Sequence, residues 1–164
     1  MAEKLVTLID PTRAAPPRLA LKSPVFDAEA VARADQALQS MSGSFQLWLD
    51  EEVARLQTAR LSAVAADWSN DALDILLIAA HDLKGMGATY DYPLVSQIAG
   101  SLCRLIDCEE GRAAARAKPS LVFAHVDAIR AAARDGVRTD AHAVGQALLH
   151  ALEMQVDALG LPLE

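Results

Sequence analysis

The 164-residue chain is long enough for one domain with a sizeable hydrophobic core. Its net charge of −7 argues against nucleic acid or an anionic membrane surface as the main partner. Hydrophobic residues make up 52% of the chain but aromatic residues only 4%, and alanine is abundant. This composition favours closely packed helices, and we expect an all-α fold.

The first 24 residues differ from the rest of the chain. They contain four of the seven prolines and a short apolar run from Leu5 to Ile9, which predicts an irregular N-terminal arm over residues 1–24. Residues 25–164 are predicted to form a single helical domain. The segment from Met1 to Lys4 lacks the basic start and long apolar core of a signal peptide, and the apolar run from Ile75 to Ala80 is far too short to cross a membrane. We therefore expect a cytoplasmic protein.

The spacing of apolar residues predicts two helices after the arm. Asp27 is a candidate N-cap for a helix over residues 28–41, and we expect Ser42 and Gly43 to end it. The second helix is predicted over residues 44–66.

The next helix carries the most distinctive residues of the chain. Ser69 or Asn70 is expected to cap it, and it is predicted to run to about Tyr90. A tight turn at Asp91-Tyr92-Pro93 follows, since proline suits the first turn of a helix. The helix after that turn is predicted to run to about Cys108, and so short a link requires the two helices to pack together in antiparallel directions.

The remaining chain is also expected to be mostly helical. Residues 109–111 are predicted to break the pattern, and residues 112–118 to form a basic, alanine-rich connector. A helix from Pro119 to about Asp135 follows, and Thr139 is expected to cap an extra C-terminal helix over residues 139–160. The apolar stripe of this last helix is predicted to consist of Val144, Leu148, Leu152 and Val156.

The cysteines and three of the four histidines give no sign of a metal site. Cys103 and Cys108 are too few and wrongly spaced for a zinc site or a disulfide framework. His142 and His150 lack an acidic or thiol partner at ligand spacing. His125 lies beside apolar residues at helical spacing, which favours a packed, hydrogen-bonded histidine.

His81 lies on the outer face of the helix predicted to end at Tyr90. On a helical wheel, the apolar stripe falls roughly 140–220° away from His81, so if the stripe faces the core then His81 faces water. The stripe consists of Leu76, Ala79, Leu83, Met86 and Tyr90. The face around His81 carries Asp74, Leu77, Ile78, Lys84, Gly85 and Ala88.

This outer face is unusual for a surface helix. Gly85 and Gly87 each cost a helix about 1 kcal/mol relative to alanine, and Leu77 and Ile78 are apolar where solvent is expected. The combination indicates a docking surface around a reactive imidazole. The alternative is an ordinary surface histidine beside glycines that permit close helix packing.

The residues His81-Asp82-Leu83-Lys84-Gly85-Met86-Gly87 resemble the phosphorylation motif of histidine-containing phosphotransfer (HPt) domains of bacterial two-component phosphorelays. That motif has a histidine, a lysine three residues later, a glycine next and a small residue two positions further on. The resemblance covers roughly Phe45 to Arg134. It implies an antiparallel four-helix bundle at about residues 44–135, with additional N-terminal and C-terminal helices. Asp91 stands where the family usually has glycine, but aspartate tolerates turn conformations better than most residues.

The resemblance implies a function for the outer face. His81 is expected to accept a phosphoryl group from a phospho-aspartate receiver domain and to pass it to another response regulator. An exposed imidazole is largely neutral at pH 7 and needs no separate base. Lys84, one turn away, is expected to stabilise the transferred group. The residues expected to dock the receiver domain are Leu77, Ile78, Gly85 and Ala88.

The resemblance also implies the partners. They are response-regulator receiver domains and a hybrid histidine kinase, and the chain is expected to act as a monomer. No cofactor is expected in this chain, because the aspartate and the Mg²⁺ of the reaction belong to the receiver domain. The chain would be a phosphocarrier without kinase activity of its own.

Two other interpretations stay open. His81-Asp82-Leu83-Lys84 also looks like the H-box of the dimerisation and phosphotransfer domains of histidine kinases, where an acid follows the histidine. The chain would then be a dimeric phosphotransferase, although no Asn- or Gly-rich nucleotide box follows and we do not expect a complete kinase. The second is a non-catalytic helical scaffold that binds a partner through Leu77 and Ile78, with His81 inert.

Overall fold

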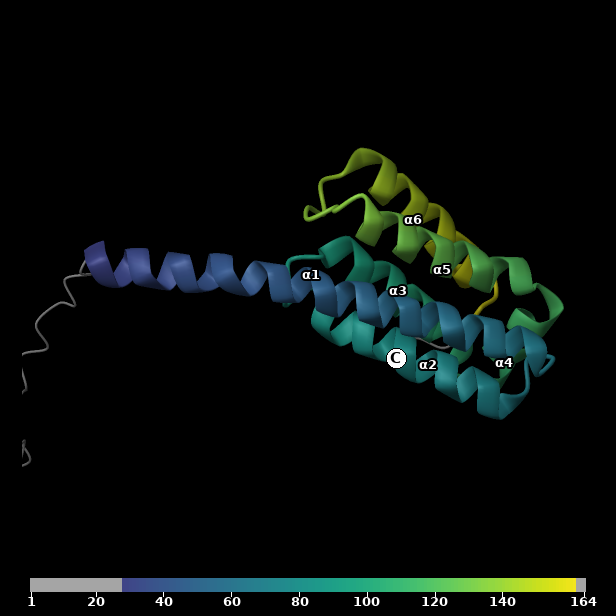
Figure 1. Cartoon of the computed structure of the whole chain (residues 1–164). Helices are drawn as coiled ribbons and strands as arrows, with labels where there is room; N and C mark the ends of the chain where they lie inside the picture. The colour runs from purple at the N-terminus through teal and green to yellow at the C-terminus, as the bar shows by residue number, and fades with distance from the viewer. Residues whose placement is uncertain (1–27, 162–164) are drawn as a thin grey trace, which may run out of the picture. The chain divides into compact units, whose positions relative to one another are not determined.

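The structure, a computed structural model, describes residues 28–161, and within that range every regular element is a helix (Figure 1). The helices are α1 (Ala28–Ala65), α2 (Asn70–Gly87), α3 (Pro93–Ile106), α4 (Glu109–Ala117), α5 (Pro119–Arg134) and α6 (Ala143–Asp157). The all-α class is therefore confirmed for these residues. The predicted arm at residues 1–24 and the predicted cap at Asp27 lie outside them. No helix within the described range combines the length and hydropathy needed to cross a membrane.

The chain divides into two units, Met1–Gln39 and Ser40–Glu164. The described part of the first unit, residues 28–39, is helical. Our predicted helix end at Ser42 and Gly43 is wrong, because α1 continues through both residues. One glycine costs a helix only about 1 kcal/mol, and without a proline or a left-handed residue beside it the backbone hydrogen bonds continue.

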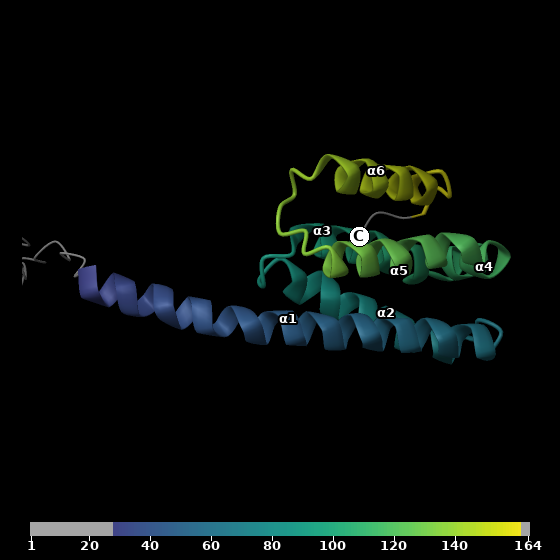
Figure 2. The ribbon, with the colours of Figure 1, turned by 45° about the horizontal axis from the view of Figure 1, so that its top comes forward.

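The second unit is organised around α3. This helix contacts α2, α4, α5 and α6, and Figure 2 shows α6 on the far side of α3 and α5 from α2. Four apolar residues of α3 at helical spacing are fully buried: Val95, Ile98, Leu102 and Leu105. A helix surrounded by others must be apolar on most of its circumference, and nine of the fourteen residues of α3 are buried.

The turn between α2 and α3 is formed as predicted, although α2 ends at Gly87 rather than near Tyr90. Asp91 has a φ of 69°, in the left-handed region that favours glycine and that aspartate tolerates. Pro93 begins α3, as expected. Between them Tyr92 is fully buried, and its hydroxyl donates a hydrogen bond to the side chain of Gln46 in α1.

The predicted break at residues 109–111 and connector at 112–118 are wrong, because residues 109–117 form α4. The Sγ of Cys108 caps the helix by accepting from the backbone N–H of Gly111 at 3.4 Å. Glutamates in the first turn suit the positive end of the helix dipole. Gly111 is required by packing rather than by a break, since a Cβ there would lie 2.0 Å from the carbonyl oxygen of Leu105.

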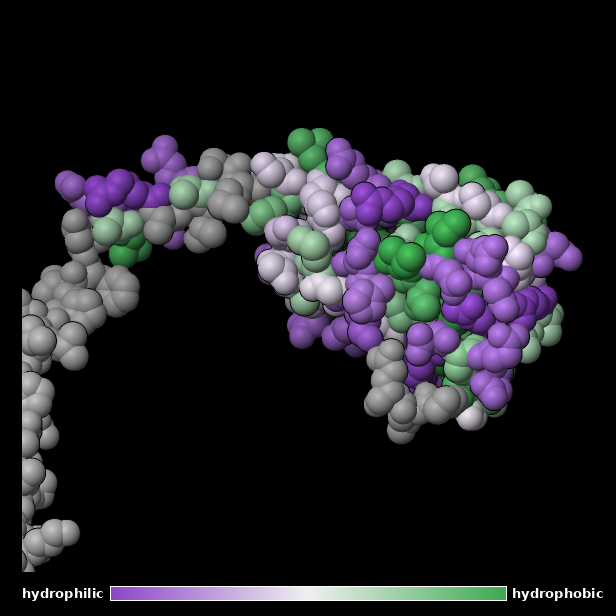
Figure 3. Space-filling view, turned by 90° about the horizontal axis from the view of Figure 1, so that it is seen from below, coloured by the Kyte–Doolittle hydropathy of each residue, from purple (hydrophilic) through white to green (hydrophobic). Residues whose placement is uncertain are grey.

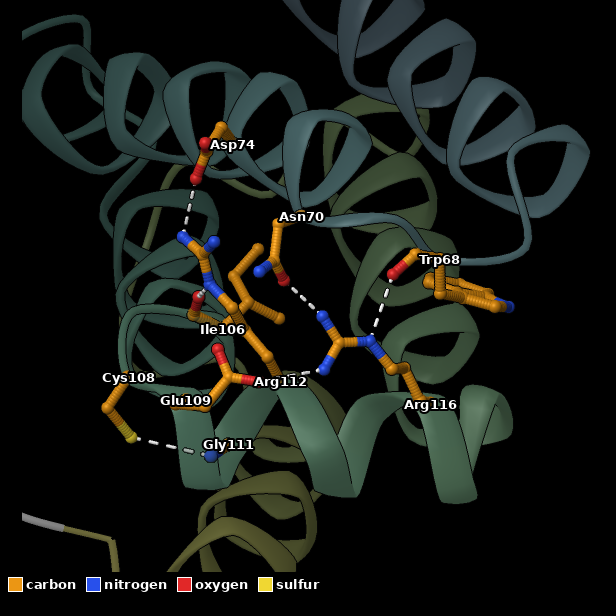
Figure 4. A network of polar contacts seen from close by, with 9 residues as sticks. All are labelled: Trp68, Asn70, Asp74, Ile106, Cys108, Glu109, Gly111, Arg112 and Arg116. Atoms are coloured by element: carbon orange, nitrogen blue, oxygen red, sulfur yellow. Dashed lines mark hydrogen bonds and ion pairs between the residues drawn. The ribbon is translucent and has the colours of Figure 1, made fainter.

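Two arginines of α4 connect it to the start of α2 (Figure 4). Arg112 pairs with Asp74 of α2 at 2.6 Å and donates to the carbonyl oxygen of Ile106 at 2.9 Å. Arg116 makes three contacts, with the carbonyl oxygen of Trp68, the carboxylate of Glu109 and the side-chain oxygen of Asn70. These contacts fix the position of α4 against the beginning of α2.

The last helix starts later than predicted. Thr139 caps only a local turn, accepting from the N–H of Ala141 at 3.1 Å. His142 is the N-cap of α6, and its Nδ1 accepts from the N–H of Gly145 at 3.1 Å. Histidine is not among the usual N-cap residues, so sequence rules alone favour Thr139.

The buried stripe of α6 is also partly different from the predicted one. Val144 and Leu148 are exposed by 73% and 40%, whereas Leu152 and Val156 are buried as expected. Gly145 and Leu149 occupy the buried positions instead. The helix turns this way because it approaches α3 closely: a Cβ on Gly145 would lie 2.4 Å from a methyl group of Leu94.

The expectation that His125 is packed and hydrogen-bonded is confirmed. The side chain is fully buried, with Nδ1 2.8 Å from the carbonyl oxygen of Leu121 and Nε2 3.0 Å from Oγ of Ser101. Because a carbonyl only accepts, Nδ1 is assigned the proton and Ser101 donates to Nε2. Burial lowers the pKa of His125, although the hydrogen bond to Leu121 opposes the change.

We expect His125 to make the fold less stable as the pH falls. The unfolded chain binds a proton near pH 6.5, whereas the buried imidazole stays neutral, so the free energy of unfolding decreases as pH drops below that value. Urea unfolding between pH 7.5 and 5.5 measures this slope. His125→Gln should be less stable at pH 7.5 but should lose less stability on acidification than the parent. If the free energy of unfolding changes with pH equally in His125→Gln and in the parent, the assignment of a neutral, buried His125 is wrong.

Candidate functional site

Helix α2 has a buried face and an exposed face, and His81 lies on the exposed one. Ser69 caps the helix by accepting from the N–H of Ala72 at 3.4 Å. The predicted inward residues Leu76, Ala79 and Leu83 are each at most 1% exposed. The predicted orientation of His81 toward solvent is therefore confirmed.

The C-terminal end of the stripe was predicted wrongly. Met86 is 37% exposed, whereas Gly87 is buried. A Cβ on Gly87 would lie 3.1 Å from the backbone nitrogen of Ser96, so the glycine lets α2 approach α3 closely. Tyr90 lies beyond the end of the helix, where its ring is 4.5 Å from the ring of Phe45.

The predicted docking residues surround His81 as expected from the helical wheel. Ile78 is 62% exposed, Leu77 is half-buried, and Gly85 and Ala88 are exposed. A Cβ on Gly85 would meet no atom within 4 Å. Ile75, which the sequence did not single out, adds a second exposed isoleucine, at 55%. Figure 3 shows hydrophobic residues gathered on the face of the second unit seen from below, with hydrophilic residues around them.

His81 lines a hollow of about 260 Å³ between α2 and the end of α3. The other lining residues are Leu77, Ile78, Asp82, Cys103 and Asp107. A larger hollow of about 720 Å³ lies elsewhere, between α1 and α5, and His81 does not line it. The smaller hollow is therefore the one that adjoins the imidazole of His81.

Two carboxylates of α2 near His81 are paired with arginines. Asp82 lies 3.5 Å from Arg55 of α1, and Asp74 lies 2.6 Å from Arg112 of α4. Such pairs stabilise a fold little where they are exposed, but each arginine offsets the negative charge of the carboxylate that it contacts. Arg55 also lies 3.0 Å from Glu52, without hydrogen-bond geometry. Burial raises the pKa of Glu52, and the Arg55 charge opposes that change.

Lys84 follows His81 by one helical turn and is held against α3. Its carbonyl oxygen accepts a hydrogen bond from Oγ of Ser96. Its aliphatic stem lies over Gly100, because a Cβ there would be 3.9 Å from both Cγ and Cδ of Lys84. Residue spacing does not point to Gly100, since only the packing of α2 on α3 brings the two residues together.

The other histidines do not join the site. His125 is buried between α3 and α5, and His142 caps α6. Within residues 28–161 no group of three or more histidine, cysteine or acidic side chains is arranged to hold a metal ion.

Scans against protein-family models, curated proteins and solved structures find no match to this chain. The sequence motif and the geometry of α2 are therefore what support the candidate site.

Two glycines of α2 offer a matched test of this geometry. Gly85→Ala should raise the free energy of unfolding by up to about 1 kcal/mol, because the added methyl group enters open space and alanine favours the helix. Gly87→Ala should lower it, by about 1–3 kcal/mol, because the methyl group would press on the backbone of Ser96. Urea unfolding of both variants measures the difference. Equal stabilisation by the two substitutions would show that α2 and α3 are not in close contact at Gly87.

Proposed function

We propose that this chain is a histidine phosphotransfer protein of the HPt type. In this proposal residues 40–65 of α1 form an antiparallel four-helix bundle with α2, α3 and α5, to which α4 and α6 are additions. The observation that carries the proposal is the arrangement on α2. An exposed His81 has Lys84 one turn further on, and Gly85 leaves open space beside it.

The proposed reaction transfers a phosphoryl group from an aspartyl phosphate of a receiver domain to an imidazole nitrogen of His81. A nitrogen–phosphorus bond forms while the bond between phosphorus and the aspartate oxygen breaks, and the receiver regains its carboxylate. The reverse steps deliver the group to the aspartate of another response regulator. The receiver supplies the aspartate and Mg²⁺, so this chain contributes an accessible imidazole and one positioned cation.

The surface around His81 suits a protein partner. Exposed Ile78 and half-buried Leu77 offer apolar contact area, and the bare backbone at Gly85 offers no side chain that would obstruct the partner. The pairing of Asp74 and Asp82 with arginines reduces repulsion of an acidic receiver pocket. We propose a monomeric, cytoplasmic carrier that works between a hybrid histidine kinase and a response regulator.

The first test concerns the nucleophile. Incubation with a phosphorylated receiver domain should label His81, and the label should be labile in acid and stable in base, as a phosphoramidate is. His81→Gln should abolish labelling and leave the melting temperature nearly unchanged, because the side chain is exposed. Labelling that survives in His81→Gln, or that maps to His125, would refute the proposal.

The second test concerns the cation. Lys84→Ala should slow labelling of His81 by about tenfold or more without preventing it, because a positioned charge stabilises the transferred group but forms no bond to it. Lys84→Arg should retain more of the rate. Quenched time courses of labelling measure the rate at His81 in both variants. If Lys84→Ala reacts as fast as the parent, Lys84 has no part in the transfer.

The second candidate function is a non-catalytic scaffold. The exposed side chains of Ile75 and Ile78 favour it, because they offer an apolar surface that can bind a partner without a reaction at His81. A scaffold would bind its partner equally well in the parent and in His81→Gln, and neither would be labelled. A dimeric phosphotransferase would be labelled but would sediment as a dimer.

A further inference from the structure

A second hollow adjoins the candidate site at Lys84. It has a volume of about 250 Å³ and is lined by residues of α2, α3 and α6. The lining residues are Lys84, Gln97, Gly100, Ser101, Arg104 and Glu153. Two cationic residues and one acidic residue therefore line the same hollow.

The path of Lys84 into this hollow crosses α3 at Gly100. The stem of the lysine lies in van der Waals range of the position that a Cβ of Gly100 would occupy. The absence of a side chain there lets the lysine lie across α3 toward α6. Lysine often packs its methylene groups on a neighbouring surface while the ammonium reaches a polar group.

The carboxylate that lines the hollow is that of Glu153 in α6. Packing and an ion pair hold this helix in place. Leu149, Leu152 and Val156 are buried beneath it. Arg104 of α3 pairs with Asp157, one turn beyond Glu153. Arg104 thus has a carboxylate partner that does not line the hollow, and Glu153 is the carboxylate that lines it together with Lys84.

We propose that Glu153 of α6 is a positioning residue that holds the Lys84 ammonium toward the hollow and so limits its help to His81. The proposal rests on the proposed phosphotransfer function. In a half-buried space opposite charges attract more strongly than in bulk water, and a cation drawn toward α6 is less available to a phosphoryl group on His81. The extra C-terminal helix would then set the rate of transfer without touching the phosphoryl group.

A double-mutant cycle tests this coupling. Glu153→Gln should speed labelling of His81 by about three- to tenfold in the parent, in line with interactions between neighbouring residues, and should have almost no effect in Lys84→Ala. Glu153→Asp keeps the charge and should remain near the parent rate. Glu110→Gln, on the exposed start of α4, removes the same charge elsewhere and should also leave the rate unchanged.

A second measurement does not require phosphotransfer. The chain has four lysines, so the Cε resonances of ¹³C-lysine-labelled protein can be assigned individually. Glu153→Gln should move the Lys84 resonance, whereas Lys118, which donates to Gln155, should keep its position. An unmoved Lys84 resonance would overturn the inference, as would an equal acceleration by Glu153→Gln with and without Lys84. A parent protein that is never labelled on His81 would instead refute the proposed function, and with it the effect on transfer.

Discussion

The close contact of α2 with α3 is the constraint on which the candidate site depends. Leu76 and Leu83 fix which side of α2 faces inward, and Gly87 allows the last turn to approach the backbone of Ser96. A helix rotates by about 100° per residue, so a shift of one residue in this packing would bury a different set of side chains and turn His81 away from solvent. The accessibility of one imidazole is thus decided by apolar residues that never meet a partner.

Charge is distributed unevenly around the site. The whole chain is acidic, with a net charge of −7, which would repel a phosphorylated or acidic partner at long range. Beside His81, however, the carboxylates of α2 pair with arginines of α1 and α4. Local pairing therefore matters more than net charge for what can approach the imidazole, because screening by salt leaves mainly short-range charge interactions.

Much of the fold was predictable because it depends on local periodicity. The orientation of α2, the stripe of α3 and the turn through Asp91 all follow from residue spacing and turn preference. Two of the errors occurred where glycine was taken as a break. Gly43 lies inside α1, and Gly111 lies inside α4 because the carbonyl of Leu105 leaves no room for a Cβ. A glycine in the sequence does not by itself reveal whether backbone conformation or close packing requires it.

The candidate site was predictable in the same way. Residue spacing identifies the site residues that lie on α2, but it does not identify residues of other helices, such as Gly100 of α3, that packing places beside them. The three contacts of Arg116 show what such tertiary junctions demand. Its guanidinium meets a carbonyl, a carboxylate and an amide oxygen with three different nitrogens, which a single lysine ammonium cannot reproduce. The junction between α4 and α2 therefore depends on the planar shape of arginine more than on its charge. Raising the ionic strength would weaken the exposed Asp82–Arg55 pair well before it loosened this junction.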